Sequence, residues 1–327
     1  MESRSVESIE TQILEPNKGT SFSRTCFNGI NALSGIGIIS IPYALSQGGW
    51  LCLMLFFLVA IICCYTGLLL QKCMSVSPSI KTYPDIGEFA FGGVLASIVL
   101  VFSIFWVGAI DGVGFKEKGA IWRWDGLISA VSMYTFCYCG HAVFPTICNS
   151  MKDRSQFPKV LFVCFLLSTI TYGSMATMGY LMYGQNLMSQ ITLNLPTGKI
   201  SSKIAIHTTI FNPITKYALV VSPIATAIED KLPLRKSKHI VSYFIRTFLV
   251  ISTVIVALTV PFFEYVMTFT GALLGVTVSI LLPCLCYLKI RKPSYLEVVF
   301  IGMILVFGSL VAISGTYTSL KNIISHV

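Results

Sequence analysis

The first long stretch without charge is the feature that most restricts how this chain can fold. Residues 25–71 form a run of 47 positions that contains no Asp, Glu, Lys or Arg. A helix needs about 20 predominantly apolar residues to cross the hydrocarbon core of a bilayer, so this run is long enough for two crossings. We therefore predict two membrane-spanning helices here, joined by a turn near Gln47, Gly48 and Gly49.

The rest of the chain repeats this pattern. Further predicted spans are the charge-free windows 89–110, 126–151, 160–198, 247–263, 265–288 and 298–320. In the window 160–198 we expect one helix to about Tyr183 and then a polar loop, and residues 204–228 are apolar with Lys216 in their middle. Together these runs predict nine spans, all helical, because none shows the short-range polar and apolar alternation of a membrane β-barrel. Charged residues make up 11% of the chain against ~25% in soluble domains, which indicates a polytopic, all-α membrane protein.

The basic residues predict the orientation in the membrane. With the N-terminus in the cytosol, sixteen Lys and Arg residues fall on the cytosolic side and six on the far side, as the positive-inside rule expects. We interpret the net charge of +9 in this way and expect no nucleic-acid partner. Residues 1–24 carry four glutamates and few apolar residues, which predicts a disordered cytosolic tail before a transmembrane domain at 25–327.

Two of the predicted spans contain strong helix breakers at the same spacing. Gly37 precedes Pro42 by five residues, and Gly140 precedes Pro145 by five. Within a helix, glycine costs about 1 kcal/mol and proline about 3 kcal/mol, and the freed backbone groups must face protein or a water-filled cavity. Paired broken spans indicate a transporter built from inverted repeats, whereas two ordinary kinks are the alternative.

Ionisable side chains inside spans are functional candidates. His141 lies beside the second break, and Lys216 follows Asn212 by about one turn in the stretch NPITK. We predict that His141, Lys216 and Asn212 couple transport to protons or ions, with Lys216 able to replace a bound sodium ion as a fixed positive charge. The alternatives are a neutral histidine hydrogen-bonded between helices and an ammonium that holds the carbonyls of a helix end.

Several stretches of the chain resemble the amino acid/auxin permease family, and most closely the plant vacuolar amino acid transporters. They are NALSGIGIISIPYALSQGGW, YPDIGEFAFG, FWVGAIDGVGF, YTFCYCGHAVFPTICNSMKD, MGYLMYG, SQITLNLP, NPITKYAL, RTFLVISTVIVALTVPFFEYVM, LPCLCYLKI and GTYTSL, and they cover the chain from about Ser21 to its end. The resemblance implies a five-plus-five inverted-repeat (LeuT-like) fold with an eleventh helix. It also implies proton-linked movement of neutral amino acids by alternating access, at the vacuolar membrane or, as the alternative, the plasma membrane.

In such a fold the two breaks would bind the substrate. We expect its carboxylate at the backbone N–H groups of Ser34, Gly35, Ile36 and Gly37, at the positive end of a half-helix. The amino group would meet carbonyls near Phe136 to Cys139, so that Phe136, Cys137, Tyr138 and Gly140 also belong to the predicted site. Tyr134 and Tyr138 would line or gate it, although packing is the ordinary role of aromatic residues in a span.

The chain departs from the family in one place. In the family, two spans separate the motif YPDIGEFAFG from the stretch that here begins at Gly92. The third and fourth helices of an expected eleven are therefore missing, and the junction lies near 91–92. A skipped exon or a faulty gene model would produce this chain. In the family fold the third helix packs beside the two broken helices and forms one side of the substrate site. Without it, the unwound backbone near Gly37 is expected to face lipid or a gap. We predict at best a weak transporter.

Other classes of function are less well supported. A membrane sensor or receptor that binds amino acids without moving them is the alternative, and its partner surface would be the tail. No nucleophile–base pair or phosphate loop indicates an enzyme, and Glu229 with Asp230 are interpreted as solvated or loop-capping carboxylates. We expect no cofactor and no metal, because Cys137 and Cys139 are two residues apart and cannot share a helix face. The sequence leaves the oligomeric state open.

Overall fold

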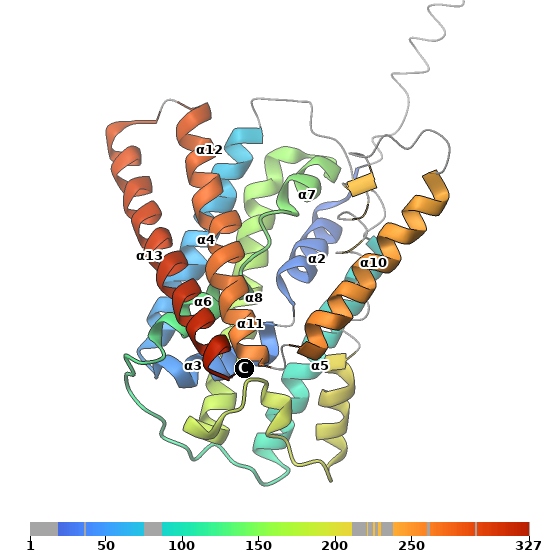
Figure 1. Cartoon of the computed structure of the whole chain (residues 1–327), viewed down its shortest axis with the longest axis vertical. Coiled ribbons are helices and arrows are strands. Elements are labelled where there is room, and N and C mark those ends of the chain that lie inside the picture. Colours follow the sequence, from blue (N-terminus) through green and yellow to red (C-terminus); the bar gives the residue numbers. More distant parts are fainter. Residues whose placement is uncertain are drawn as a thin grey trace, which may run out of the picture.

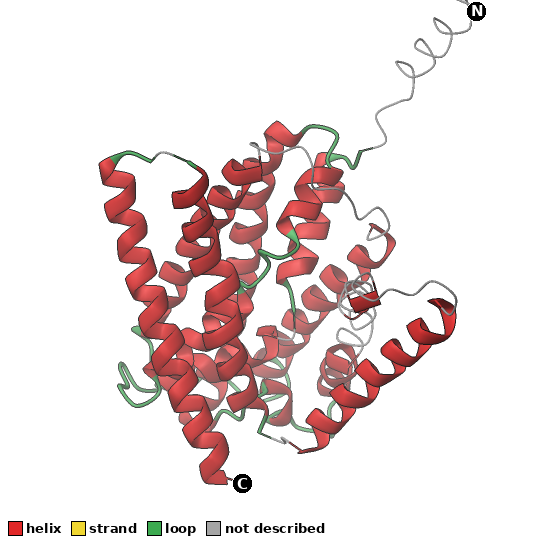
Figure 2. Ribbon diagram, turned by 45° about the horizontal axis from the view of Figure 1, so that its top comes forward, coloured by secondary structure: helices red, strands yellow, loops and turns green. Residues whose placement is uncertain are grey.

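The computed structural model describes residues 19–35, 37–74, 87–210, 221, 225, 228–229, 238–259, 262–291 and 293–326. In these ranges the chain forms helices connected by loops (Figure 2). The only strand-like contact among these residues is an isolated bridge between Thr20 and Met151. The prediction of an all-helical protein is therefore confirmed for the part of the chain that is described. The five-plus-five inverted repeat stays a prediction.

The N-terminal half begins with a broken pair of helices. Helix α2 (Phe22–Leu33) and helix α3 (Gly37–Gly48) are bent by 53° relative to each other. The predicted turn follows α3, where Gly49 takes a positive φ of 79° that suits glycine. Two further helices are α4 (Cys52–Met74) and α5 (Gly87–Ala109), and α5 runs without interruption across the junction at 91–92 (Figure 1).

The first helix starts earlier than the sequence predicted. Residues 19–24 were assigned to the tail, but α2 begins at Phe22, and the N–H of Thr20 donates to the carbonyl of Ser150 at 2.6 Å. The N–H of Lys152 donates back to the carbonyl of Thr20 at 3.1 Å. These bonds tie the residues just before α2 to the loop that follows the second break.

The middle of the chain contains the second broken pair. Helix α6 (Leu127–Cys137) and the short α7 (Phe144–Ser150) are separated by six residues. The turn η1 (Arg154–Gln156) then leads into α8 (Phe157–Tyr183), which ends where the sequence predicted because Gly184 has a φ of 54°. The turns η2 (Gly184–Asn186) and η3 (Ile191–Leu193) form the polar loop after it, and residues 200–210 begin another helix.

The C-terminal part consists of α10 (Lys238–Thr259), α11 (Phe263–Thr270), α12 (Leu282–Ile290) and α13 (Tyr295–His326). Two π-helical turns, η4 (Gly271–Gly275) and η5 (Thr277–Leu281), join α11 to α12 in one continuous helix. The helix that corresponds to the predicted span at 247–263 is α10, and it begins earlier than predicted, at Lys238. Asn212 and Lys216 lie outside the described residues.

Four described helices are long and apolar enough to cross a membrane: Cys52–Cys73, Arg154–Asn186, Phe263–Ile290 and Tyr295–Ser325. A fifth is obtained if the bent pair α2–α3 is one span. Shorter apolar helices cover Val94–Ala109, Leu127–Cys137 and Val241–Ile255. Multiple membrane-spanning helices are thus present, whereas the total of nine stays a prediction.

Small residues bring the central helices together. A side-chain carbon on Gly271 would lie 2.1 Å from the carbonyl oxygen of Ser132, and one on Gly315 would lie 2.5 Å from Oγ of Ser132. Such close backbone approach is how helices associate in lipid, where apolar surface alone gives little preference. The result is that α6 packs tightly between η4 and α13, while α3 lies between α6 and α8.

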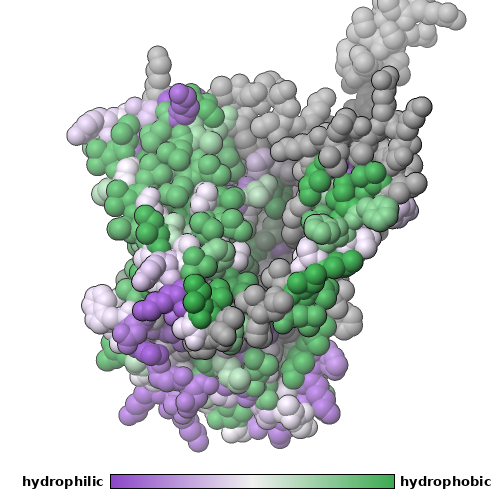
Figure 3. Space-filling model, in the orientation of Figure 1, coloured by the Kyte–Doolittle hydropathy of each residue, from purple (hydrophilic) through white to green (hydrophobic). Residues whose placement is uncertain are grey.

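The outer surface has the character expected in a bilayer. Apolar residues cover most of the face in Figure 3, and hydrophilic residues gather at its lower end. Tyr243, Phe244 and Phe248 of α10 are each at least 70% exposed. At the opposite end, Nη2 of Arg291 donates to the carbonyl of Lys72 at 3.0 Å, so two loops predicted to be cytosolic lie at the same end.

At the lower end, the loop after α5 binds across the ends of α3 and α8. The N–H groups of Trp50 and Leu51 donate to the carbonyls of Ala120 and Ile121 at 3.0 and 2.9 Å. The N–H of Ala120 donates in turn to the hydroxyl of Tyr180 at 2.7 Å. This loop fixes one end of α3 beside α8.

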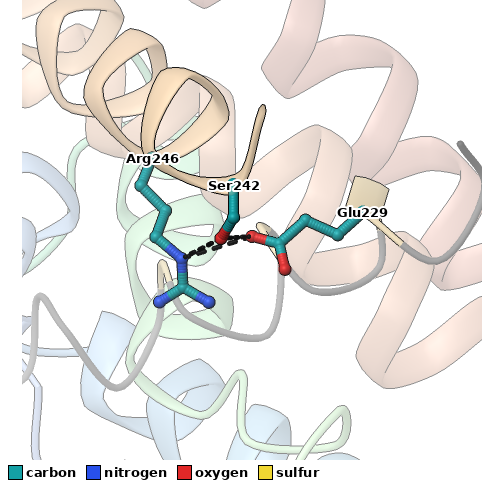
Figure 4. Close-up of polar contacts among 3 residues, drawn as sticks. All are labelled: Glu229, Ser242 and Arg246. Carbon is teal, nitrogen blue, oxygen red and sulfur yellow. Dashed lines mark hydrogen bonds and ion pairs between the residues drawn. The ribbon is translucent and has the colours of Figure 1, made fainter. Parts of the chain in front are cut away.

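Glu229 is not a solvated carboxylate, which corrects one of the two sequence interpretations. Its side chain is 10% exposed and lies against α10 (Figure 4). Oε1 of Glu229 accepts a hydrogen bond from Oγ of Ser242 at 2.7 Å and one from Nε of Arg246 at 3.2 Å. The carboxylate therefore anchors the chain before α10 to that helix.

Candidate functional site

The first break lies between Leu33 and Gly37. The N–H of Ser34 donates to the carbonyl of Ile30 at 2.7 Å and ends α2, and the N–H of Gly35 turns back to the carbonyl of Leu33 at 2.8 Å. Ser34 and Gly37 are buried and Gly35 is half-buried. The predicted site residue Ile36 lies outside the described residues.

The second break lies between Cys137 and Phe144. The N–H of Tyr138 lies 3.3 and 3.2 Å from the carbonyls of Tyr134 and Thr135, which closes α6, and the N–H of Gly140 donates to the carbonyl of Tyr138 at 2.9 Å. Non-helical backbone is tolerated in a membrane where it is enclosed by protein. Tyr138, Gly140 and His141 of this segment are buried and meet that condition, whereas Cys139 and Ala142 are exposed.

The two prolines occupy different positions, although their spacing from glycine is equal. Pro145 lies in the first turn of α7, where its missing N–H removes no helical hydrogen bond. Pro42 lies inside α3, beyond the break, where it leaves the carbonyl of Ile38 without its helical donor. The equal spacing in the sequence therefore does not correspond to equal geometry.

The glycine of each break packs against the last helical residue of the other broken span. A side-chain carbon on Gly37 would lie 2.6 Å from Sγ of Cys137, where α6 ends. One on Gly140 would lie 2.9 Å from Cδ2 of Leu33, where α2 ends. The structure thus brings together the two breaks that the sequence singled out, and the contacts are reciprocal.

The backbone at Gly37 is not open to lipid. Gly37 and Cys137 are both buried, and α8 lies along the other side of α3. The expectation that this backbone would face lipid or a gap is wrong for Gly37, because α6 and α8 close over it.

Sequence reasoning missed a residue that touches both breaks, Tyr172 of α8. Its hydroxyl donates to the carbonyl of Leu33 at 2.5 Å and lies 3.5 Å from the carbonyl of Cys137. The N–H of Gly35 lies 3.4 Å from the same oxygen. The sequence did contain a signal for this residue, because Tyr172 lies within the apolar window 160–198 and a buried tyrosine hydroxyl needs a hydrogen-bond partner.

The other predicted aromatic residues are held by packing. Tyr138 donates from its hydroxyl to Oγ1 of Thr169 at 2.9 Å, and its ring stacks on Phe165 with centroids 5.7 Å apart. The ring of Tyr134 meets Phe56 of α4 edge to face at 5.3 Å. Phe136 is half-buried beside Gly271. These contacts correspond to the alternative in which the aromatic residues pack the spans.

His141 is buried between the second break and α4. Nε2 lies 2.9 Å from the carbonyl oxygen of Cys63 and 2.9 Å from Oγ1 of Thr66. Because a carbonyl can only accept, the first contact assigns the ring proton to Nε2. Nδ1 then carries a lone pair, and it is buried without a hydrogen-bond partner among the described residues.

The described cysteines and acids show no metal site. Among these residues, no three His, Cys, Asp or Glu side chains gather as ligands. Cys137 is buried whereas Cys139 is exposed, and Cys284 and Cys286 differ in the same way.

The sequence model of the family described as "Transmembrane amino acid transporter protein" matches residues 18–110 and 94–321. The chain belongs to this transmembrane amino acid transporter family. Membership agrees with the resemblance seen in the sequence and identifies a transporter family rather than a family of enzymes. Together with its apolar helices, it makes the chain an integral, multi-pass membrane protein.

Curated relatives in the transmembrane amino acid transporter family match nearly the whole chain. Amino acid transporter AVT1I of Arabidopsis thaliana is 42% identical, with 98% of this chain and 100% of the relative covered. Amino acid transporter AVT1J of the same plant is 40% identical, over 94% of this chain and 92% of the relative.

The alignment with AVT1I is longer than this chain. It extends over 406 positions, whereas the chain has 327 residues. The alignment covers 98% of the chain, about 320 residues, so about 86 of its 406 positions face no residue here. Two spans of ~20 residues with their loops need a segment of about that length. The two matched pieces of the family model also share residues 94–110, next to the junction at 91–92.

Proposed function

We propose that this protein is a secondary transporter that moves neutral amino acids by alternating access, either together with protons or in exchange for them. The observation that carries the proposal is the reciprocal contact of the two breaks, Gly37 with Cys137 and Gly140 with Leu33. Broken spans that meet at the middle of a bundle are the usual substrate site of inverted-repeat transporters. The names of the relatives AVT1I and AVT1J support an amino acid as the substrate.

The proposed site uses the backbone at both breaks. α3 begins at Gly37, so the N–H of Gly37 lies at the positive end of its dipole and suits a carboxylate, while Ser34, Gly35 and Ile36 remain candidates from the sequence. α2 and α6 end at Leu33 and Cys137, whose carbonyls carry the negative end and suit an ammonium group. One amino acid would thus be held by its two charged groups, without a charged side chain from the protein.

The proposed proton site is Nδ1 of His141. This nitrogen has a free lone pair in a buried position and belongs to the segment between α6 and α7 that substrate binding would move. Protonation would require a partner for the new N–H, so proton binding and a change in this segment are coupled. Lys216 and Asn212 remain candidates from the sequence.

The present chain would be a weak transporter because it lacks two spans of the family. The long alignment with AVT1I and the shared residues 94–110 support a deletion at 91–92, where α5 now joins two motifs in a single helix. A skipped exon or a faulty gene model would account for it. Although α6 and α8 cover Gly37, we expect alternating access also to need the third and fourth helices of the family fold, which this chain lacks.

Uptake into proteoliposomes tests the proposal. The purified 327-residue chain is compared with a chain that carries the additional segment of AVT1I after Phe91, each with and without an imposed pH gradient. We expect little uptake by the first and gradient-stimulated uptake of neutral amino acids by the second. Robust uptake by the short chain would contradict the weak-transporter proposal, and uptake that ignores the gradient would remove proton coupling.

A membrane sensor is the second candidate, favoured by the closed contact of the two breaks in a chain that lacks two spans. Binding of an amino acid without flux in both chains would support it. We propose the vacuolar membrane as the location, with the plasma membrane as the alternative and the N-terminus in the cytosol. Fluorescence of a tagged chain and protease protection of the N-terminal tag would test these assignments.

A further inference from the structure

The hydroxyl of Tyr172 occupies the point where the two broken spans converge. The side chain is fully buried, and its oxygen contacts Leu33 from one break and Cys137 from the other. The hydroxyl has one proton, which it donates to Leu33 at 2.5 Å, while the carbonyl of Cys137 at 3.5 Å is left with a long contact. The carbonyl of Leu33 also accepts from the N–H of Gly35 at 2.8 Å, so the carbonyl of Cys137 is the one that the hydroxyl leaves incompletely satisfied.

Both carbonyls belong to helix C-termini. Leu33 ends α2 and Cys137 ends α6, so each carbonyl carries the partial negative charge of a helix end. The two oxygens can be no more than about 6 Å apart, because both lie within hydrogen-bonding reach of one hydroxyl. An ammonium group has three donors and a full charge, so it would satisfy both oxygens better than the hydroxyl does.

We propose that Tyr172 is an internal competitor for the amino group of the substrate, a latch that holds the two breaks together until an amino acid displaces its hydroxyl. This inference rests on the proposed function and adds a residue that sets affinity and closure of the same site. Tyr172 is a positioning residue, since it acts through the backbone of both breaks.

The contacts around Tyr172 hold the ring where the hydroxyl can act. Its ring meets that of Tyr138 edge to face with centroids 5.8 Å apart, and Thr169, one turn earlier in α8, accepts a hydrogen bond from the hydroxyl of Tyr138. Removal of the hydroxyl alone would leave these contacts in place. It would leave the carbonyl of Cys137 and one acceptor position on the carbonyl of Leu33 open to an ammonium group, while the N–H of Gly35 keeps its bond to Leu33.

The variant Tyr172→Phe removes the latch and keeps the ring. The matched control is Tyr183→Phe, the same change on the same helix at a buried hydroxyl without a hydrogen-bond partner among the described residues. Tyr172→Met, which also lacks the hydroxyl, provides a second variant with different packing. Each protein is purified in detergent and first tested for a single monodisperse species.

Labelling of Cys137 tests the latch without any substrate. Its thiol is buried against Gly37, so it reacts with a maleimide only when the breaks separate. We expect labelling of Cys137, measured by mass spectrometry, to be about 5–10 times faster in Tyr172→Phe than in the control, the effect of one hydrogen bond of ~1 kcal/mol. Cys148 in α7 should label at an unchanged rate. Equal rates at Cys137 in Tyr172→Phe, Tyr172→Met and control would overturn the latch.

Binding of a neutral amino acid tests the competition. We expect the dissociation constant of the amino acid to fall about 5–10-fold in Tyr172→Phe, while that of the matching carboxylic acid without an amino group stays unchanged. An unchanged or higher constant in a variant with faster Cys137 labelling would overturn the competition. If labelling were still faster but no amino acid bound even to the chain with the additional segment after Phe91, the latch would stand and the proposed function would fail.

Discussion

Gly37 and Cys137 are in contact across two helix breaks that lie a hundred residues apart in the chain. A side-chain carbon on Gly37 would be 2.6 Å from Sγ of Cys137 and 3.4 Å from its Cα. A side-chain carbon closer than 3.0 Å to another atom would force one of the two to move, and here the backbone Cα of Cys137 is also close, at 3.4 Å. The absence of a side chain at position 37 is thus a condition for the two breaks to meet.

We therefore expect Gly37→Ala to separate the two breaks and to lower stability by about 1–3 kcal/mol, the usual effect of overpacking. Thermal unfolding of the purified protein measures this loss. Gly35→Ala is the matched control, because its nearest neighbour is the carbonyl of Leu33 at 3.9 Å. Addition of Cys137→Ala should restore much of the lost stability, and equal effects of both alanine variants would contradict the contact.

A second close approach predicts a larger effect. A side-chain carbon on Gly271 would lie 2.1 Å from the carbonyl oxygen of Ser132, which is backbone in α6 and cannot rotate away. Gly271→Ala should therefore displace the π-helical turn η4 and reduce stability by at least ~3 kcal/mol or prevent folding. Gly275→Ala, one turn later, meets Thr135 at an ordinary 3.6 Å and should be tolerated. Thermal unfolding and detergent monodispersity distinguish the two.

The sequence predicted those features that depend on local composition. Charge-free runs predicted helices, the glycines at 48 and 49 predicted the turn there, and the polar residues after Tyr183 predicted the end of α8. The existence of both breaks also followed from Gly37 and Gly140. It could not show that Pro42 lies inside α3 whereas Pro145 begins α7, because the position of a proline relative to a break depends on which backbone bonds remain.

The partners of the candidate site were beyond sequence reasoning. Tyr172 contacts Leu33, 139 residues away, and His141 contacts Cys63, 78 residues away. Such pairs are set by which helices pack together, and no periodicity within one helix encodes them. The same limit explains why Gly37 was expected to be open, since α6 and α8 cover it only in the folded bundle.

Asp153 predicts a pH dependence at the start of α8. Its carboxylate accepts hydrogen bonds from the hydroxyl and N–H of Ser155 and from the side chain of Gln156, and these bonds hold its pKa below the ordinary value. A lowered pKa stabilises the fold above the unfolded pKa, and the contribution is lost as pH falls through the folded pKa. Asp153→Asn should thus reduce the melting temperature at neutral pH, with the difference vanishing in acid. Asp125→Asn, in the exposed loop before α6, is the control, and a constant difference at all pH values would contradict the capping role.

His141 provides the test of proton coupling. His141→Gln keeps an N–H donor for the carbonyl of Cys63 but removes the nitrogen that could bind a proton. We expect the variant to fold and to bind amino acids, while stimulation of uptake by a pH gradient is largely lost, because no proton can bind at this position. Proteoliposome uptake by the chain with the additional segment after Phe91 measures this stimulation.

The matched control for His141 is His207→Gln, which changes an exposed histidine of the helix at 200–210. It should leave gradient stimulation unchanged. If His141→Gln also kept full stimulation, the ring would be a neutral link between the second break and α4, held by Cys63 and Thr66. The proton would then be bound elsewhere, and Lys216→Met would be the next variant to measure, because the stretch around Lys216 contains the other predicted coupling residues.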